Sequence, residues 1–110
     1  MIFIYSTPAR IVANTLIYTG KGFLFSLLIG TDGVNDPVVS VYDYTDATLP
    51  ATRIVPSNTY DASVLGLNGV VFKYAKEFNT GLYVKIADIG TGEVIVDWRA
   101  ASGMRKVKIG

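Results

Sequence analysis

The stretch GLYVKIADIGTGEVIVDWR, residues 81–99, decides the fold class of this chain. Apolar residues occupy every second position in both of its halves, and a period of two is that of a β-strand with one buried and one wet face. Between the halves, the glycine-containing segment 89–92 favours a turn. The stretch therefore predicts two strands, 82–88 and 93–98, joined as a hairpin. Their inward-facing residues are expected to be Leu82, Val84 and Ile86 in the first strand and Val94, Val96 and Trp98 in the second.

The same organisation extends over the rest of the chain. Eleven glycines and four prolines interrupt its 110 residues, at a spacing of about eight to twelve residues that is typical of a sandwich or barrel. No segment has the period of a helix, and Asn68-Gly69 favours a second hairpin between the strands on either side of it. The other expected strands are 2–5, 10–18, 23–29, 38–44, 51–55, 64–67 and 70–74.

These patterns predict an all-β chain that forms a single-domain antiparallel β-sandwich, jelly-roll-like, with about eight strands. The expected divisions are an N-terminal arm over residues 1–8, the sandwich over 9–99, and a basic C-terminal strand or tail over 100–110. A chain of this length has room for one hydrophobic core only.

Composition excludes several classes of function. Half of the residues are apolar and only 17% are charged, which excludes intrinsic disorder because the chain can bury enough apolar surface to offset its ordering entropy. Cysteine and histidine are both absent. Disulfides, zinc sites built on Cys or His, and His-based catalytic triads are therefore excluded. We predict a protein that is not an enzyme, with no catalytic, cofactor-binding or metal-binding residues.

Charge is unevenly distributed along the chain. The net charge is +1, but residues 1–98 have a balance of −3, whereas residues 99–110 carry four basic side chains and no acidic one. A basic tail of this kind suits an acidic partner. No basic face with interleaved aromatic residues is visible, so direct binding of nucleic acid is not expected. We expect no membrane segment either, because no stretch reaches the roughly 18 apolar residues that span a bilayer.

Two of the expected strands, 10–18 and 23–29, are apolar on both faces. In the second of them, Leu24 and Leu28 fall on the face opposite to the one formed by Phe23, Phe25, Leu27 and Ile29. The outer faces of a two-layer sandwich meet solvent, and a large exposed apolar patch marks an association surface. We therefore predict a homo-oligomer or a subunit of a larger assembly, with roughly 800 Å² buried per partner.

Two polar clusters are candidate sites. The segment Asp32–Asp36 has the oxygen-rich composition of a cation-binding loop, but its residues also have the ordinary chemistry of a turn, which is the favoured interpretation. Asp43 and Asp46 are interleaved with tyrosines, which suggests a glycosidase pair, a sugar-binding surface, or the solvated end of a strand. The solvated strand end is favoured.

From Thr19 to Arg99 the layout resembles small β-sandwich virion proteins of tailed bacteriophages. The resemblance covers about 80 residues of the chain. It lies in strand spacing rather than in a catalytic motif. The segments that carry it are the glycine-led TGKGFLFSLLIG at 19–30, the strand 38–44 with Val41-Tyr42-Asp43, the segment GLYV at 81–84 and the closing TGEVIVDW at 91–98.

The resemblance implies a non-enzymatic decoration or cement protein on the surface of the virion capsid. Such a protein is made in the host cytoplasm, associates with itself, with a trimer favoured, and stabilises the head by bridging major capsid subunits. The contact residues that we expect are Phe3, Ile4 and Tyr5 of the arm, which would add a strand to a neighbouring sheet, Leu24 and Leu28, and the basic Arg105, Lys106 and Lys108. The alternative is a carbohydrate-binding or adhesion module of a phage tail or head fibre, with a platform of Tyr42, Tyr44 and Tyr60.

Overall fold

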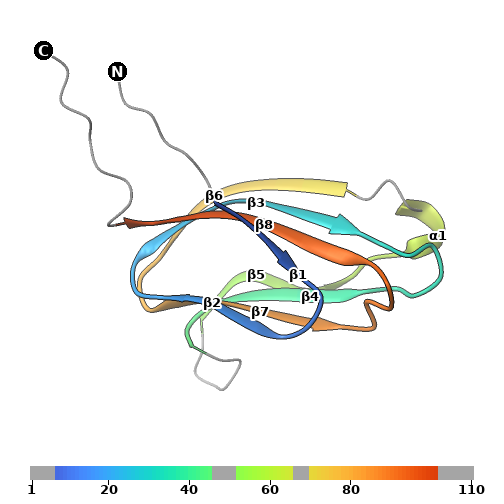
Figure 1. The fold of residues 1–110 in the computed structure, drawn as a ribbon, viewed down its shortest axis with the longest axis horizontal. Coiled ribbons are helices and arrows are strands. Elements are labelled where there is room, and N and C mark those ends of the chain that lie inside the picture. Colours follow the sequence, from blue (N-terminus) through green and yellow to red (C-terminus); the bar gives the residue numbers. More distant parts are fainter. Residues whose placement is uncertain (1–6, 46–51, 66–69, 102–110) are drawn as a thin grey trace, which may run out of the picture.

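The structure, a computed structural model, describes residues 7–45, 52–65 and 70–101. These residues form eight strands and one short helix, arranged as two stacked sheets (Figure 1). The elements are β1 (Thr7–Ile11), β2 (Thr15–Thr19), β3 (Gly22–Gly30), β4 (Val38–Asp43), β5 (Thr52–Thr59), α1 (Ala62–Leu65), β6 (Val70–Phe78), β7 (Gly81–Ala87) and β8 (Glu93–Ala100). The prediction of an all-β sandwich is confirmed.

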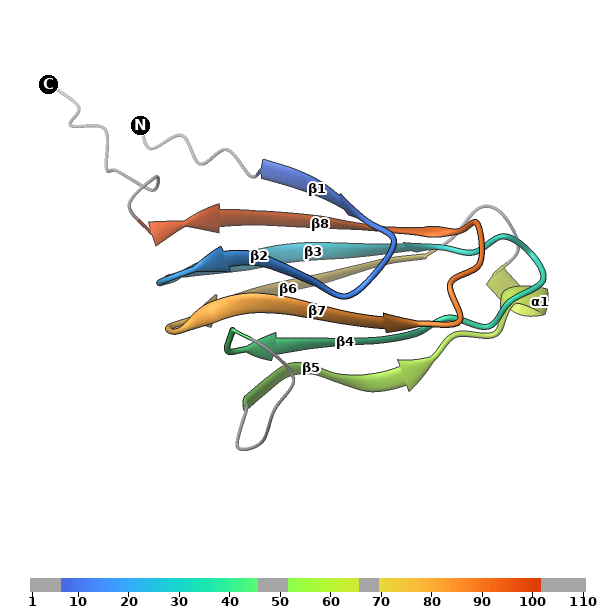
Figure 2. The ribbon, with the colours of Figure 1, turned by 60° about the horizontal axis from the view of Figure 1, so that its bottom comes forward.

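The strand order is that of a jelly roll. The first sheet has the order β1-β8-β3-β6 and the second β2-β7-β4-β5, and all the pairings are antiparallel. Strands β1 and β8, β2 and β7, β3 and β6, and β4 and β5 are all partners, so the chain behaves as one long hairpin whose strand pairs alternate between the two sheets. Figure 2 shows the neighbouring strands side by side. Eight strands rolled up in this way define the jelly roll.

The core lies between the two sheets and contains the residues that the alternation predicts. Strands β7 and β8 bury the expected side chains, although Trp98 is only partly buried and packs against the core, its ring 5.1 Å from that of Tyr18. The largest side chains that are fully buried include Phe78, Leu24 and Leu27. Burial of this apolar surface is the main stabilising term of the fold.

The predicted hairpin between 82–88 and 93–98 is wrong. Strand β7 lies between β2 and β4 in the second sheet, and β8 lies between β1 and β3 in the first. The connection between them crosses from one sheet to the other, through Asp88 and Gly90, which both have positive φ, 55° and 58°. Alternation specifies which face of a strand is buried, and two strands that face each other across a core have the same pattern as two that lie side by side.

The expected strand 10–18 is two strands in different sheets. The chain leaves the first sheet after Ile11 and enters the second at Thr15. At the crossing, the side-chain oxygen of Asn14 accepts a hydrogen bond from the backbone N–H of Ile86 at 2.8 Å. The change of sheet explains why this segment is apolar at both odd and even positions. Val12 and Leu16 remain exposed, at 46% and 42%.

The segment between β4 and β6 also differs from expectation. Strand β5 continues through Pro56 to Thr59 because it is the edge strand of the second sheet, where the missing N–H of proline disturbs no ladder. The expected strand 64–67 is wrong in its described part, because residues 62–65 form α1. This helix is capped by Asp61, which accepts from the N–H of Ser63 at 2.9 Å. The Asn68-Gly69 turn lies outside the described residues.

The first and last strands mark the limits of the described sandwich. Strand β1 already begins at Thr7, and β8 continues to Ala100. Of the residues expected to make contacts, Phe3, Ile4, Tyr5, Arg105, Lys106 and Lys108 lie outside the described ranges.

Candidate functional site

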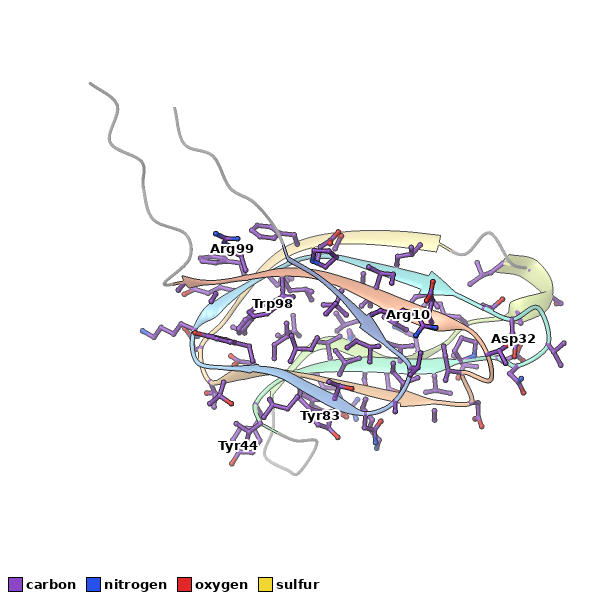
Figure 3. The ribbon with its side chains drawn as sticks, viewed as in Figure 1. Arg10, Asp32, Tyr44, Tyr83, Trp98 and Arg99 are labelled. Carbon is purple, nitrogen blue, oxygen red and sulfur yellow. The ribbon has the colours of Figure 1, made fainter. Side chains whose placement is uncertain are left out.

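The outer face of the first sheet carries an apolar strip, here called the phenylalanine face and formed by Phe23, Phe25, Leu28 and Ile95. All four side chains are partly exposed. The rings of Phe23 and Phe25 are stacked, with centroids 6.5 Å apart and planes 17° from parallel. Leu28 lies opposite Ile95 in the ladder between β3 and β8. Figure 3 shows Arg99 on the same outer side, whereas Trp98 points between the sheets.

A β-bulge in β3 determines which residues reach this face. Leu24 pairs with Trp98 and Ser26 pairs with Asp97, so that Phe25 is an extra residue on its strand. One inserted residue reverses the alternation of the strand beyond it. Leu24 therefore points into the core and is 0% exposed. The expectation that Leu24 shares the outer face with Leu28 is wrong, while Leu28 does lie on that face.

Polar contacts border the phenylalanine face. The hydroxyl of Ser26 donates a hydrogen bond to Asp97 at 2.8 Å. Arg10 on the edge strand β1 forms an ion pair with Glu93 on β8. An apolar centre with a polar border is the usual composition of a protein–protein interface.

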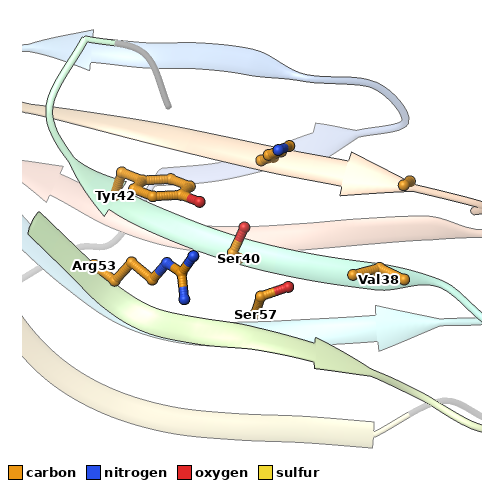
Figure 4. A pocket seen from close by; sticks show the side chains of 7 residues that line it. Val38, Ser40, Tyr42, Arg53 and Ser57 are labelled. Atoms are coloured by element: carbon orange, nitrogen blue, oxygen red, sulfur yellow. The ribbon is translucent and has the colours of Figure 1, made fainter. Parts of the chain in front are cut away.

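The outer face of the second sheet contains a shallow hollow of about 210 Å³, here called the Tyr42 hollow (Figure 4). Strand β4 contributes the residues that alternate with its two core valines, and the neighbouring strands β5 and β7 contribute the walls. The lining residues are Val38, Ser40, Tyr42, Arg53, Ser57, Lys85 and Ala87.

Strand register arranges the hollow in two halves. Tyr42 pairs with Arg53 on one side and with Tyr83 on the other, which gives an aromatic and cationic end. Ser40 pairs with Lys85, next along β4. Val38 pairs with Ala87 at the opposite, apolar end. The hollow thus changes from cationic to apolar along a single strand.

The polar end is organised around the hydroxyl of Tyr42. Hydrogen bonding to the Ser40 side chain lowers the pKa of the Tyr42 hydroxyl below its usual value. Burial of the hydroxyl raises this pKa and so opposes the shift. A hydrogen bond from Arg53 and the positive charges of Arg53 and Lys85 lower the pKa further. The Arg53 guanidinium also lies 5.7 Å from the centre of the Tyr42 ring. Because Tyr42 is only 5% exposed, it forms the floor of the hollow rather than a free stacking platform.

The three tyrosines of the expected glycan platform do not come together. Tyr44 follows β4 and is 37% exposed, close to Tyr42 in sequence. Tyr60 follows β5, and its N–H donates to the carbonyl of Pro37, just before β4, at 2.9 Å. Since β4 and β5 are antiparallel, Tyr60 lies at the end of β4 opposite to Tyr42. It packs against the core, and burial raises the pKa of its hydroxyl.

The carboxylate of Asp43 stabilises a turn. It accepts hydrogen bonds from the backbone N–H groups of Asn79 and Thr80 at 2.9 and 2.8 Å, in the turn between β6 and β7. Asp46, the other carboxylate of the less favoured glycosidase pair, lies outside the described residues. The local geometry of Asp43 is that of a strand end that fastens an adjacent turn.

Asp32 is likewise a turn residue. Its two carboxylate oxygens accept hydrogen bonds from Val34, Asn35 and Thr91. Hydrogen bonds from Asn35 are the main cause that holds the pKa of Asp32 far below its usual range. Among the described residues, no three Asp or Glu side chains gather into a potential metal site.

Comparison with known proteins found no matching family model, curated protein or solved structure. In the described part of the chain, no helix is long and apolar enough to cross a membrane.

Sequence reasoning identified Tyr42 as a site residue but missed Ser40, Arg53, Ser57 and Lys85. The signal for Ser40 was available, because it lies two positions from Tyr42 and therefore on the same face of the strand. Arg53, Ser57 and Lys85 come from strands distant in sequence, and only the register brings them to β4.

Proposed function

We propose that this protein is a structural protein of a tailed-phage virion, a capsid decoration protein that associates with itself and stabilises the head by bridging major capsid subunits. The observation that carries this proposal is the phenylalanine face, where the stacked Phe23 and Phe25 lie with Leu28 and Ile95 on the water-facing side of a two-layer sandwich. The jelly roll supports it at the level of fold, because viral capsid domains use this architecture. Lectins also use the jelly roll, so the proposal rests on the phenylalanine face and not on the fold.

Association through this face is energetically reasonable. Complete burial of a Phe, Leu or Ile side chain stabilises by roughly 1.5–3 kcal/mol relative to full exposure. The four side chains are already partly buried, so each supplies a fraction of that energy. A single contact of this size is weak, and many identical copies on a capsid make the attachment strong through avidity.

The two ends of the chain have a role in the same proposal. Strand β1 is the edge strand of the first sheet, and an edge exposes unpaired backbone groups to which a neighbouring strand can be added. The residues Phe3, Ile4 and Tyr5, which precede β1, would reach such an edge on an adjacent subunit. Arg105, Lys106 and Lys108 would contact acidic surfaces of the major capsid protein.

The test measures self-association and capsid binding together. The full chain is expected to sediment as an oligomer, with a trimer favoured, at micromolar concentration and to co-sediment with heads of its phage. Phe25→Ser should weaken both properties. The control is Val64→Ser, which removes another apolar side chain, one that is 78% exposed on α1, away from the sheet. A wild-type monomer that leaves heads undecorated would refute the proposal.

A second candidate function, carbohydrate binding in an adhesion module, is favoured by a different observation. The Tyr42 hollow lies on the opposite outer face from the phenylalanine face. It therefore stays open when the first sheet is covered. Binding on a glycan array that disappears in Tyr42→Phe, which deletes only the hydroxyl, would support this function. An array without any signal would exclude it.

A further inference from the structure

The Tyr42 hollow has two cations, Arg53 and Lys85, that no acidic side chain neutralises within the described ranges. Arg53 and Lys85 are both exposed and stand on opposite sides of β4. Of the described residues, none that lines the hollow is acidic and neither cation forms an ion pair, whereas Arg10 on the other sheet is paired with Glu93. Two uncompensated positive charges around one small concavity favour an anionic group.

The arginine is also positioned before any ligand arrives. Its guanidinium lies against the Tyr42 ring and donates to the Tyr42 hydroxyl. A planar guanidinium held in this way loses little side-chain freedom on binding and can donate two parallel hydrogen bonds to a carboxylate. Lys85 adds a second, more mobile charge from the β7 side.

The remaining half of the hollow has the chemistry of a sugar site. Val38 and Ala87 provide an apolar surface at one end, Ser40 lies beside Lys85 in the middle of β4, and Ser57 on β5 adds an exposed hydroxyl to the lining. Figure 4 shows Ser40 and Ser57 approaching the hollow from β4 and β5, with Arg53 and Tyr42 at one end and Val38 at the other. Apolar walls with a few convergent polar groups are typical of small-ligand sites.

The size of the hollow restricts what can occupy it. Its volume is about 210 Å³. Sites that enclose larger ligands measure about 300–1,000 Å³. One ring-sized unit fits, whereas an acidic peptide needs a longer groove. A bare phosphate or acetate would leave the apolar half without contacts.

We propose that the Tyr42 hollow binds one carboxylate-bearing sugar residue, with the carboxylate at Arg53 and Lys85 and the C–H face of the ring over Val38 and Ala87. The exposed hydroxyl of Ser57 then bonds to a ring hydroxyl, while Ser40, only 2% exposed, stays bonded to Tyr42. This inference deepens the carbohydrate-binding function proposed above by naming the class of sugar, and it is independent of self-association through the phenylalanine face.

The test is an amide chemical-shift titration of the full chain with matched ligands. Methyl glucuronide is expected to shift resonances of β4, β5 and β7, and to bind at least about tenfold more tightly than methyl glucoside, which has a hydroxymethyl group in place of the carboxylate. Acetate and inorganic phosphate should bind more weakly than the glucuronide. Equal affinity for acetate or phosphate would overturn the sugar half of the proposal.

Four variants separate the contributions. Lys85→Gln and Arg53→Gln should each weaken glucuronide binding at least about fivefold, consistent with loss of a charge-assisted hydrogen bond. Lys76→Gln removes a positive charge from an exposed position on β6, in the other sheet, and should leave glucuronide binding unchanged. Ala87→Leu fills the apolar end and should abolish sugar binding while weak acetate binding remains. An equal loss in Lys76→Gln, or unchanged sugar binding in Ala87→Leu, would overturn the assignment.

Failure of this inference is distinguishable from failure of the functions proposed above. If methyl glucoside binds as tightly as the glucuronide, the carboxylate preference is wrong but carbohydrate binding stands. If no saccharide produces shifts in the wild-type spectrum, both are wrong. Preserved dispersion of the amide spectrum shows that each variant is folded, and sedimentation reports self-association separately.

Discussion

Replacing Leu24 with alanine should destabilise the protein far more than the same replacement at Leu28, four positions along the same strand. Leu24 is completely buried in the core, whereas Leu28 is partly exposed on the phenylalanine face. The two substitutions remove identical atoms from β3. Any difference between their effects therefore comes from the side of the sheet on which each residue lies.

The expected magnitudes follow from burial. Leu→Ala in a packed core costs about 2.7–5 kcal/mol, because the lost transfer energy is increased by the cavity that remains. Leu24 should fall in this range, about 3 kcal/mol or more by the same principle. Leu28→Ala in the monomer should cost less than about 1.5 kcal/mol, since the Leu28 side chain is partly exposed in the folded protein and leaves no enclosed cavity when it is removed.

Urea denaturation at equilibrium, followed by the fluorescence of Trp98, measures both values. With slopes of about 1–3 kcal/mol per molar urea, a loss of 3 kcal/mol lowers the midpoint by about 1–3 M. The measurement is made at two protein concentrations, because an oligomer interface at Leu28 would make its effect increase with concentration. If Leu28→Ala is as destabilising as Leu24→Ala at low concentration, the bulge at Phe25 and the assignment of faces are wrong.

Three further predictions concern other parts of the molecule. Gly22→Ala should destabilise by about 1–3 kcal/mol or prevent folding, because a Cβ there would lie 2.5 Å from a backbone carbonyl; Gly30→Ala, whose nearest neighbour is at 3.4 Å, is the control and should cost less than about 1 kcal/mol in the same urea assay. The Asp32 carboxyl should remain ionised in an NMR titration when the pH falls through 3.8, where an ordinary Asp is half protonated. Because its folded-state pKa is depressed, Asp32 contributes stability that is present above pH 4 and is lost as the pH falls toward its folded pKa, and an Asp32 that titrates normally would contradict the hydrogen-bonded turn. Tyr42 should ionise below the roughly pH 10 of free tyrosine, and Ser40→Ala should raise its pKa, as followed by its ring resonances; an unchanged pKa would contradict the role of Ser40.

The sequence alone specified the class of fold and the buried face of most strands. Alternation in 82–86 and 94–96 marked the residues that the core contains, and this works because side chains of a strand point to opposite faces whatever strand lies beside it. The glycine and proline spacing correctly indicated many short strands. The position of Tyr42 on the outer face of its strand, opposite to the core residues Val39 and Val41, has the same local origin.

Other features depended on contacts between distant segments. Whether β7 and β8 are neighbours or lie on opposite sheets, where β3 bulges, and which residues stand beside Tyr42 are all decided by strand pairing. Pairing is non-local, and its energy comes from the whole set of ladders and from the closed core, so a short window of sequence carries little of it. The individual strands and their faces were therefore predictable from local pattern, whereas the Tyr42 hollow, assembled from residues 38–42, 53–57 and 85–87, exists only in the tertiary structure.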